Sequence, residues 1–199
     1  MSKLTVLIPT FNSEKTIRKT LESVCWADEI LVCDSYSTDK TLEICKEYGA
    51  KIIQHKYINS AKQKNWAIPQ SKFDWVLQVD TDEELDPALQ EEIKKVLKSV
   101  GTEVEGFKAP FKHMVLGEWL KVLNLYPEYH LRLFRRDAGR FEDKEVHAQV
   151  KVSGEVKTLE NHFIHNGMPS ISKQLGNLDR YSRYQADEFK KRNKKPRWY

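Results

Sequence analysis

Short runs of aliphatic and β-branched residues alternate with amphipathic stretches through the first half of the chain, and this alternation constrains the fold most strongly. Four such runs predict strands, at residues 4–8, 30–33, 51–54 and 75–79. Their composition is typical of strands that are covered on both faces. Because strands separated by helical stretches form βαβ units, the sequence predicts an α/β fold with a mostly parallel central sheet.

Apolar residues at helical spacing predict helices between these strands. They begin near Ile17 and Leu42 and, with a weaker pattern, cover residues 60–68. A longer helix is expected after the fourth strand. Asp86, which is followed by proline, is its candidate N-cap, and Gly101 is its expected end.

The second half of the chain is less regular. Strands are predicted at residues 106–111, 131–135 and 148–152, in a mixed rather than a parallel arrangement. A last helix is predicted over residues 171–191. A soft boundary falls near Gly101, where the regular alternation stops.

The composition is that of an ordinary soluble protein, with 40% hydrophobic and 31% charged residues. No apolar run approaches the roughly 20 residues that span a bilayer, and the N-terminal run is too short and polar-flanked for a signal peptide. We therefore expect a cytoplasmic protein. The three cysteines, Cys25, Cys33 and Cys45, suggest neither disulfides nor a zinc site, and we interpret them as small buried apolar residues.

Two of the four predicted strands end in an aspartate, Asp34 and Asp80. Open α/β sheets bind ligands beyond the carboxyl ends of their strands, where an aspartate needs a cation or a hydrogen-bond donor to offset its desolvation. Alternate residues of an extended turn project to the same side. Asp80 and Asp82 are therefore expected to share one divalent ion with phosphate oxygens.

An acidic run before a helix also complements the positive end of the helix dipole. That explanation suits Asp86, and we interpret Glu83 and Glu84 as solvated or facing the dipole. Asp80 and Asp82 lie too far upstream of the helix to serve it.

The first predicted strand is followed by no phosphate-binding loop. Residues 9–14 contain no glycine, so neither a Rossmann dinucleotide fingerprint nor a Walker loop is present. A bound diphosphate would then need to be neutralised by a metal and by basic side chains.

Three ordered motifs resemble glycosyltransferase family two, which has the GT-A fold. They lie at residues 7–12, 34–41 and 80–84. Further details look like the branch that includes lipopolysaccharide-core β-1,4-glucosyltransferases acting next to the Kdo sugar. These details lie at residues 26–30, 131–136, 146–147 and 164–165.

The resemblance covers almost the whole chain and implies one GT-A domain, a Rossmann-like nucleotide-diphospho-sugar transferase fold, over residues 1–199. Residues 1–100 would form the nucleotide-sugar-binding half and residues 101–170 the acceptor-side half. Residues 171–199 would form a C-terminal helix and a basic tail.

Carried over to this sequence, the resemblance implies a uridine-diphosphate sugar held at the strand ends. Pro9, Thr10 and Asn12 would line the pocket for the base and ribose, with Glu14 near the ribose hydroxyls. Asp34 would accept a hydrogen bond from uracil N3.

The resemblance also implies where the metal and the diphosphate bind. Asp80, with Thr81 beside it, would contact the ribose or the donor sugar, whereas Asp82 would ligate Mg²⁺ or Mn²⁺. His147 is either a second metal ligand or a structural residue. Because arginines along a strand alternate between its faces, only some of those near residue 132 can point to the site. The other expected contacts to the nucleotide sugar are Lys64, Asn65, Arg132 and Arg135.

An inverting transferase needs one carboxylate as general base for the acceptor hydroxyl. In the resembling branch this base is the glutamate of a Val-His-Glu motif, but here Ala148 stands in its place. We expect Glu145 to act as the base, with Asp143 as the nearest substitute and Glu142 as another. All three are alternatively exposed loop charges.

The resemblance implies transfer of a hexose, with glucose the first candidate, from a UDP-sugar to a saccharide or lipid-linked glycan such as lipopolysaccharide core. One alternative is transfer to a polyprenyl phosphate. Another is a non-catalytic module that binds nucleotide sugars or membrane surfaces, which Ala148 and the basic tail favour. A nucleotidyltransferase is disfavoured because its glycine-rich phosphate loop is absent.

The last ten residues, 190–199, combine basic and aromatic side chains, although the net charge of the chain is only +4. Such a segment is either a solvated tail or a contact to the anionic inner-membrane surface on its cytoplasmic face. No nucleic-acid partner is expected. The resembling branch continues beyond this point, so we expect the tail to be the edge of an interfacial segment.

Overall fold

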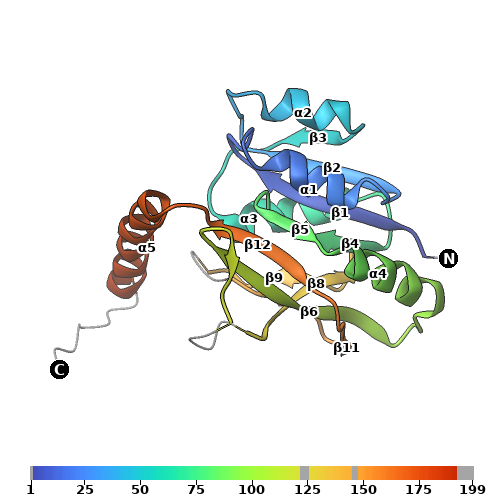
Figure 1. Ribbon diagram of the computed structural model, residues 1–199. Coiled ribbons are helices and arrows are strands. Elements are labelled where there is room, and N and C mark those ends of the chain that lie inside the picture. Colours follow the sequence, from blue (N-terminus) through green and yellow to red (C-terminus); the bar gives the residue numbers. More distant parts are fainter. Residues whose placement is uncertain (1, 122–125, 145–147, 192–199) are drawn as a thin grey trace.

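The structure is a computed structural model that describes residues 2–121, 126–144 and 148–191. A mixed sheet forms its centre (Figure 1). The strands of this sheet are β1 (Leu4–Thr10), β2 (Glu29–Asp34), β3 (Lys51–Gln54), β4 (Trp75–Gln78), β5 (Glu83–Leu85), β6 (Val104–Val115), β7 (Glu118–Trp119), β8 (Glu128–Arg135), β11 (Glu155–Thr158) and β12 (Phe163–Met168). Within the described residues, its order is β3-β2-β1-β4-β8-β6-β12-β5, and β7 and β11 pair with β6.

The remaining elements surround this sheet. Strands β9 (Arg140–Phe141) and β10 (Val150–Lys151) form a separate antiparallel pair. The helices are α1 (Ile17–Val24), α2 (Thr41–Glu47), α3 (Ser60–Ala67) with the short 3-10 helix η1 (Ile68–Gln70), α4 (Pro87–Ser99) and α5 (Ile171–Lys191).

Strands β1 to β4 are parallel, as predicted, and both faces of this part of the sheet are covered. Successive side chains of a strand point to opposite faces. Val6 and Ile8 of β1 therefore pack in the cluster that contains residues of α1, α2 and α4, whereas Leu7 packs in the cluster that contains residues of α3. This two-sided burial explains why the strands were recognisable as apolar runs.

The second half is mixed, also as predicted. Strand β8 runs antiparallel to both β4 and β6, and β12 runs parallel to β6. Strand β8 thus joins the parallel part of the sheet to the strands of the second half.

Strand β5 was not predicted. Residues 80–83 form a turn in which the Glu83 amide donates to the Asp80 carbonyl (3.0 Å), and β5 then pairs with β12. Glu83 is only 2% exposed. The interpretation of Glu83 as a solvated residue is therefore wrong, because β5 pairs with β12 and the Glu83 side chain is buried there.

Helix α4 begins as predicted, since the Asp86 carboxylate caps it by accepting from the amide of Ala88 (2.8 Å). The helix ends at Ser99 rather than at Gly101. Of the cysteines, Cys33 and Cys45 are buried as expected, but Cys25 is exposed just beyond the end of α1.

Helix α5 has the predicted bounds and projects away from the sheet (Figure 1). Its apolar residues Ile171, Leu175 and Leu178 expose 61%, 62% and 62% of their surface. None of the helices in the described ranges is long and apolar enough to cross a membrane.

Candidate functional site

The site lies at the carboxyl ends of the parallel strands, where Thr10 of β1 and Asp34 of β2 are register partners. Asp34 is fully buried. Its carboxylate accepts from the amide of Ser37 (3.0 Å), from the Ser37 hydroxyl (2.5 Å) and from Gln54 Nε2 (3.0 Å). Donors from the protein therefore satisfy this carboxylate at the predicted position.

The loops after β1 and β2 hold each other. Asn12, which has a positive φ of 45°, accepts through Oδ1 from the amide of Thr38 (2.8 Å). Glu14 accepts through Oε2 from the amide of Lys40 (3.1 Å). These two predicted ligand residues thus shape the loops that border the site.

Two other predicted residues of β1 lie at this edge. Pro9 is half-buried, and Thr10 is 4% exposed. The Thr10 hydroxyl is a buried group for which the described residues supply no hydrogen-bond partner. An unpartnered buried hydroxyl indicates a position that a ligand or a water molecule completes.

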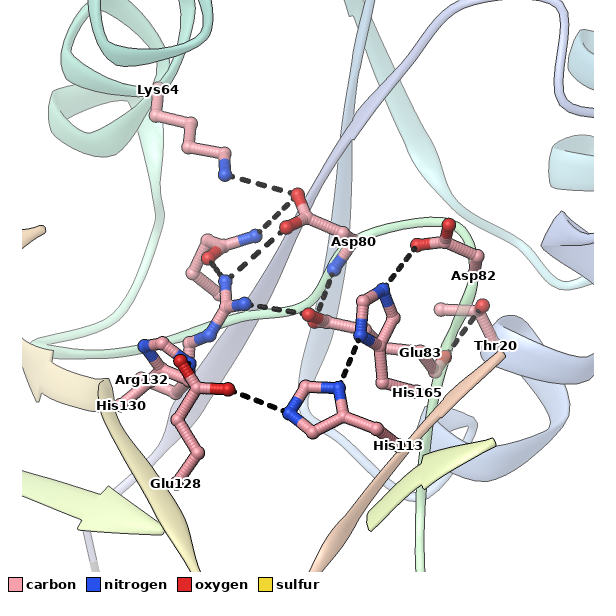
Figure 2. Close-up of polar contacts among 11 residues, drawn as sticks. Thr20, Lys64, Asp80, Asp82, Glu83, His113, Glu128, His130, Arg132 and His165 are labelled. Atoms are coloured by element: carbon pink, nitrogen blue, oxygen red, sulfur yellow. Dashed lines mark hydrogen bonds and ion pairs between the residues drawn. The ribbon is translucent and has the colours of Figure 1, made fainter. Parts of the chain in front are cut away.

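Asp80 lies between two cations (Figure 2). Its Oδ1 is 3.0 Å from Lys64 Nζ, and its Oδ2 is 3.4 Å from Arg132 NH1. Burial alone would raise the pKa of Asp80, but Lys64 and Arg132 outweigh this effect and hold the pKa well below its usual range. The Asp80 side chain, 35% exposed, is therefore an anion whose cations can also meet phosphate oxygens.

Arg132 joins β4, β5 and β8. Its NH2 lies 2.6 Å from Glu83 Oε1, and its NH1 donates to Gln78 Oε1. Burial raises the pKa of Glu83 to about 7, against the opposing effect of Arg132. Arg132 thus compensates two carboxylates at once, and sequence reasoning found Arg132 but missed Glu83.

A pocket of about 350 Å³ opens beside this cluster. Lys64, Asp80 and Arg132 contribute to its lining from the donor side, and Glu128 and Tyr129 contribute from β8. Ala148 and Gln149 also line it. Its volume lies within the range of small-molecule sites, about 300 to 1,000 Å³.

Asp80 pairs with Lys64 and Arg132, whereas Asp82 lies nearest to His165 (Figure 2), and the expectation that the two carboxylates share one ion stays a prediction. The turn closed by the Glu83 amide directs Asp80 to Lys64 and directs Asp82 to His165. Thr81, between them, donates to the Ser13 hydroxyl (3.2 Å) and so ties this turn to the loop before α1.

Asp82 Oδ1 and His165 Nε2 lie 3.8 Å apart, which is longer than a hydrogen bond. Two ligands of an octahedral ion with bonds of about 2.1 Å lie about 3.0 Å apart when adjacent and about 4.2 Å apart when opposite. The observed separation of 3.8 Å lies between these two values, so a small movement of either side chain would let both bind one divalent ion. No group of three or more His, Cys, Asp or Glu side chains in the described part of the chain is placed to hold a metal ion.

His165 continues into a chain of side chains on neighbouring strands (Figure 2). Its Nδ1 lies 3.0 Å from Nδ1 of His113, and Nε2 of His113 lies 2.7 Å from Glu128 Oε2. His130 Nε2 lies 3.1 Å from the other Glu128 oxygen. Sequence reasoning missed His113, Glu128 and His130 because strand pairing alone brings them together.

Two predicted ligand residues are used elsewhere. Arg135 stacks on Trp75 and donates to the carbonyls of Gly101 and Val104, both at 3.0 Å. Arg135 is an odd number of positions from Arg132, so it points to the other face of β8. Asn65 exchanges two hydrogen bonds with the backbone of Phe141 (2.8 and 2.9 Å) and so holds β9. Neither side chain faces the pocket.

The predicted catalytic region is only partly described. Asp143 is exposed. Glu145 and His147 lie outside the described residues. Both stay predictions.

Comparison with known proteins supplies the family. Residues 5–151 match the sequence model of Glycosyl transferase family 2. The lipopolysaccharide core biosynthesis glycosyltransferase LpsC of Rhizobium meliloti (strain 1021) is 28% identical over 203 residues, which cover 98% of this chain and 75% of LpsC.

Two solved structures share the fold. S. aureus TarS 1-349 in complex with UDP-GlcNAc has a TM-score of 0.58 at 21% identity, covering 81% of this chain and 58% of that one. Glucosyl-3-phosphoglycerate synthase from Mycobacterium tuberculosis, in complex with Mn²⁺, UDP and phosphoglyceric acid, has a TM-score of 0.59 at 16% identity, covering 90% and 75%. These likenesses show the fold alone, and the predicted GT-A fold is confirmed.

Proposed function

Because the chain belongs to glycosyl transferase family 2, we propose that it transfers a hexose from a UDP-sugar to a saccharide or lipid-linked glycan, with inversion. One observation carries this proposal. Asp80, compensated by Lys64 and Arg132, lies just beyond the end of β4, and the neighbouring Asp82 and His165 are close enough to hold a divalent ion together. The two cationic side chains and the metal would together neutralise the negative charge of a diphosphate bound at this turn.

Donor binding follows from these side chains. Lys64 is 6% exposed, so a phosphate oxygen that replaces Asp80 as its partner would be bound in a poorly hydrated place. The uracil ring would lie near Thr10 and Asp34. Since Ser37 and Gln54 occupy the Asp34 carboxylate, reading uracil N3 requires Ser37 to turn aside.

Asp82 and His165 would hold the metal, Mg²⁺ or Mn²⁺. The bound ion supplies neutralising charge for the diphosphate. M. tuberculosis glucosyl-3-phosphoglycerate synthase was solved with Mn²⁺ and UDP, which supports a metal here.

In the transfer step, the acceptor hydroxyl oxygen forms a bond to the anomeric carbon as the bond from that carbon to the phosphate oxygen breaks. The bonding pair leaves with UDP, and the hydroxyl proton passes to a carboxylate base. Glu145 and Asp143 remain the proposed bases. Lys64 and Arg132 stabilise the charge that develops on the leaving diphosphate.

The acceptor would enter the pocket from the β8 side. Tyr129, 44% exposed and in the pocket lining, offers a ring on which a sugar can stack. LpsC is named for lipopolysaccharide core biosynthesis, which supports a lipid-linked acceptor of this kind.

A contact with the cytoplasmic face of the membrane is also proposed. The exposed residues Ile171, Leu175 and Leu178 of α5 precede a basic segment in the sequence, and this combination suits an anionic lipid surface. Sedimentation with anionic vesicles should fall with rising salt. Equal sedimentation with neutral and anionic vesicles would contradict this contact.

Donor binding can be tested with a screen of UDP-hexoses by thermal unfolding, each with and without Mn²⁺. We expect one UDP-hexose to raise the melting temperature only with metal and to be transferred to a glycan acceptor. Asp82→Asn should lose the part of this rise in melting temperature that depends on Mn²⁺. Glu91→Gln, at an exposed carboxylate on α4, is the matched control. Stabilisation without turnover or hydrolysis of any UDP-hexose would favour a non-catalytic binding module instead.

A further inference from the structure

Three neighbouring strands place one line of polar side chains across the sheet. His113 of β6 and His165 of β12 are register partners, and Glu128 of β8 is the register partner of Phe111, two residues before His113. The line runs from Glu128 through His113 to His165 and ends facing Asp82 (Figure 2). Its first two contacts, at 2.7 and 3.0 Å, are within hydrogen-bond distance.

The first contact fixes the proton on His113. A carboxylate only accepts hydrogen bonds, so Glu128 Oε2 requires a proton on Nε2 of His113. A neutral imidazole has one N–H, which leaves Nδ1 of His113 as an acceptor.

The second contact fixes the position of the proton on His165 in turn. Nδ1 of His113 can accept only if Nδ1 of His165 carries the proton. The Nε2 of His165 then carries no proton and presents its lone pair. Two neutral imidazoles have no other arrangement that satisfies both contacts.

The lone pair of His165 Nε2 points toward Asp82 Oδ1, 3.8 Å away. The repulsion between a lone pair and a carboxylate oxygen is relieved by a metal cation between them or by a proton on Nε2. The line of side chains therefore sets His165 in the one tautomer that can bind a metal beside Asp82.

His130 keeps Glu128 in place at the other end. It lies 3.1 Å from Glu128 Oε1, and burial followed by the Arg132 cation lowers its pKa. Glu128 thus accepts from two imidazoles on two strands. The Glu128 carboxylate is 42% exposed, the His113 ring 18% and the His165 ring 31%, so the line begins at the pocket and its middle member is the most buried.

We propose that Glu128 and His113 are positioning residues that fix the tautomer of His165 so that its Nε2 can bind a metal together with Asp82. This proposal rests on the proposed function, because it takes the donor's metal to be the ion held by Asp82 and His165. It adds two residues from the acceptor-side half that act on the metal through His165 rather than as its ligands.

The test compares two variants of His113. His113→Gln retains an amide donor for Glu128 and an amide acceptor for His165, whereas His113→Phe keeps a ring but removes both. Calorimetric titration of Mn²⁺ in the presence of UDP should show about a 10-fold or greater loss of affinity for His113→Phe, as is common when an outer partner of a metal ligand is lost. His113→Gln should recover most of it.

Nitrogen NMR of the metal-free protein supplies a readout that does not depend on activity. We expect the proton of His165 on Nδ1 in the wild type and in His113→Gln, and its loss from that position in His113→Phe. A proton on Nε2 of wild-type His165 would overturn the proposal, as would unchanged Mn²⁺ affinity in His113→Phe.

The outcomes separate this proposal from the proposed function. If Asp82→Asn loses Mn²⁺ binding while His113→Phe binds it like the wild type, the positioning role is wrong and the metal site stands. If the wild type binds no Mn²⁺ with UDP, both the positioning role and the metal part of the proposed function are wrong.

Discussion

The two sides of the sheet hold their polar side chains in different ways. At the ends of β1 and β2, loops that follow the same strands occupy the polar groups, so that Asp34 accepts from Ser37 and Asn12 accepts from Thr38. Across β6, β8 and β12, polar side chains contact one another from strand to strand. The first side is shaped by local loops, whereas the second ends at His165, whose Nε2 lies 3.8 Å from Asp82 Oδ1.

The two sides should therefore respond differently to ligands and to substitutions. Local loops can rearrange around a ligand without disturbing the sheet. A cross-strand contact is fixed by the register of the sheet, so a change in one side chain alters its partners on other strands. Arg132 of β8 lies where the two sides meet and compensates Asp80 and Glu83 together.

The largest expected effect comes from this junction. Arg132→Leu should lower the free energy of unfolding by about 3 to 5 kcal/mol, because it leaves the buried Glu83 without its cation. Urea denaturation measures the loss. Arg132→Lys should recover part of it, and a loss under about 1 kcal/mol in Arg132→Leu would show that the ion pairs do not join the two sides.

A smaller effect is expected on the loop side. Asp34→Ala should lower the free energy of unfolding by about 1 to 3 kcal/mol, because the Ser37 amide and Gln54 lose their buried acceptor. Asp34→Asn, which keeps an acceptor, is the matched control. Faster amide exchange should be confined to the loops after β1 and β2, and faster exchange throughout the sheet would contradict a local role.

Asn65 separates a structural role from a ligand role. Asn65→Ala should lower the free energy of unfolding by about 1 to 2 kcal/mol, since two hydrogen bonds to Phe141 are lost. The affinity for a UDP-sugar, measured by calorimetry, should change little. A large loss of donor affinity with unchanged stability would restore Asn65 as a donor ligand.

The smallest expected effect concerns the thiols. Burial raises the pKa of Cys33 and Cys45 to about 11, whereas Cys25 is exposed. A thiol reagent at pH 8 should therefore modify one cysteine of the native protein quickly, with no change in melting temperature. All three should react in denaturant, and rapid labelling of Cys33 in the native protein would show that β2 opens readily.

The loop side was predictable because its signals are local. Apolar runs gave the strands, and Asp34 and Asp80 follow or end those runs. The sequence placed Lys64 in the region expected to contact the nucleotide sugar. Only the structure shows that its side chain points to Asp80.

The cross-strand side was not predictable in the same way. Glu83 is buried because β5, three residues long, pairs with β12, a segment about eighty positions away. Without that pairing, an acidic run reads as solvated. The same holds for His113 and Glu128, whose contact depends on the register of β6 and β8.

The central claim is that Asp82 and His165 hold one ion between the two sides of the sheet. A double-mutant cycle of Asp82→Asn and His165→Gln on Mn²⁺ affinity in the presence of UDP tests this most directly. We predict that each single variant weakens binding and that the double variant is scarcely weaker than the worse single one, because both remove ligands of the same ion. Losses that add in full, or a single variant that binds Mn²⁺ like the wild type, would contradict the account.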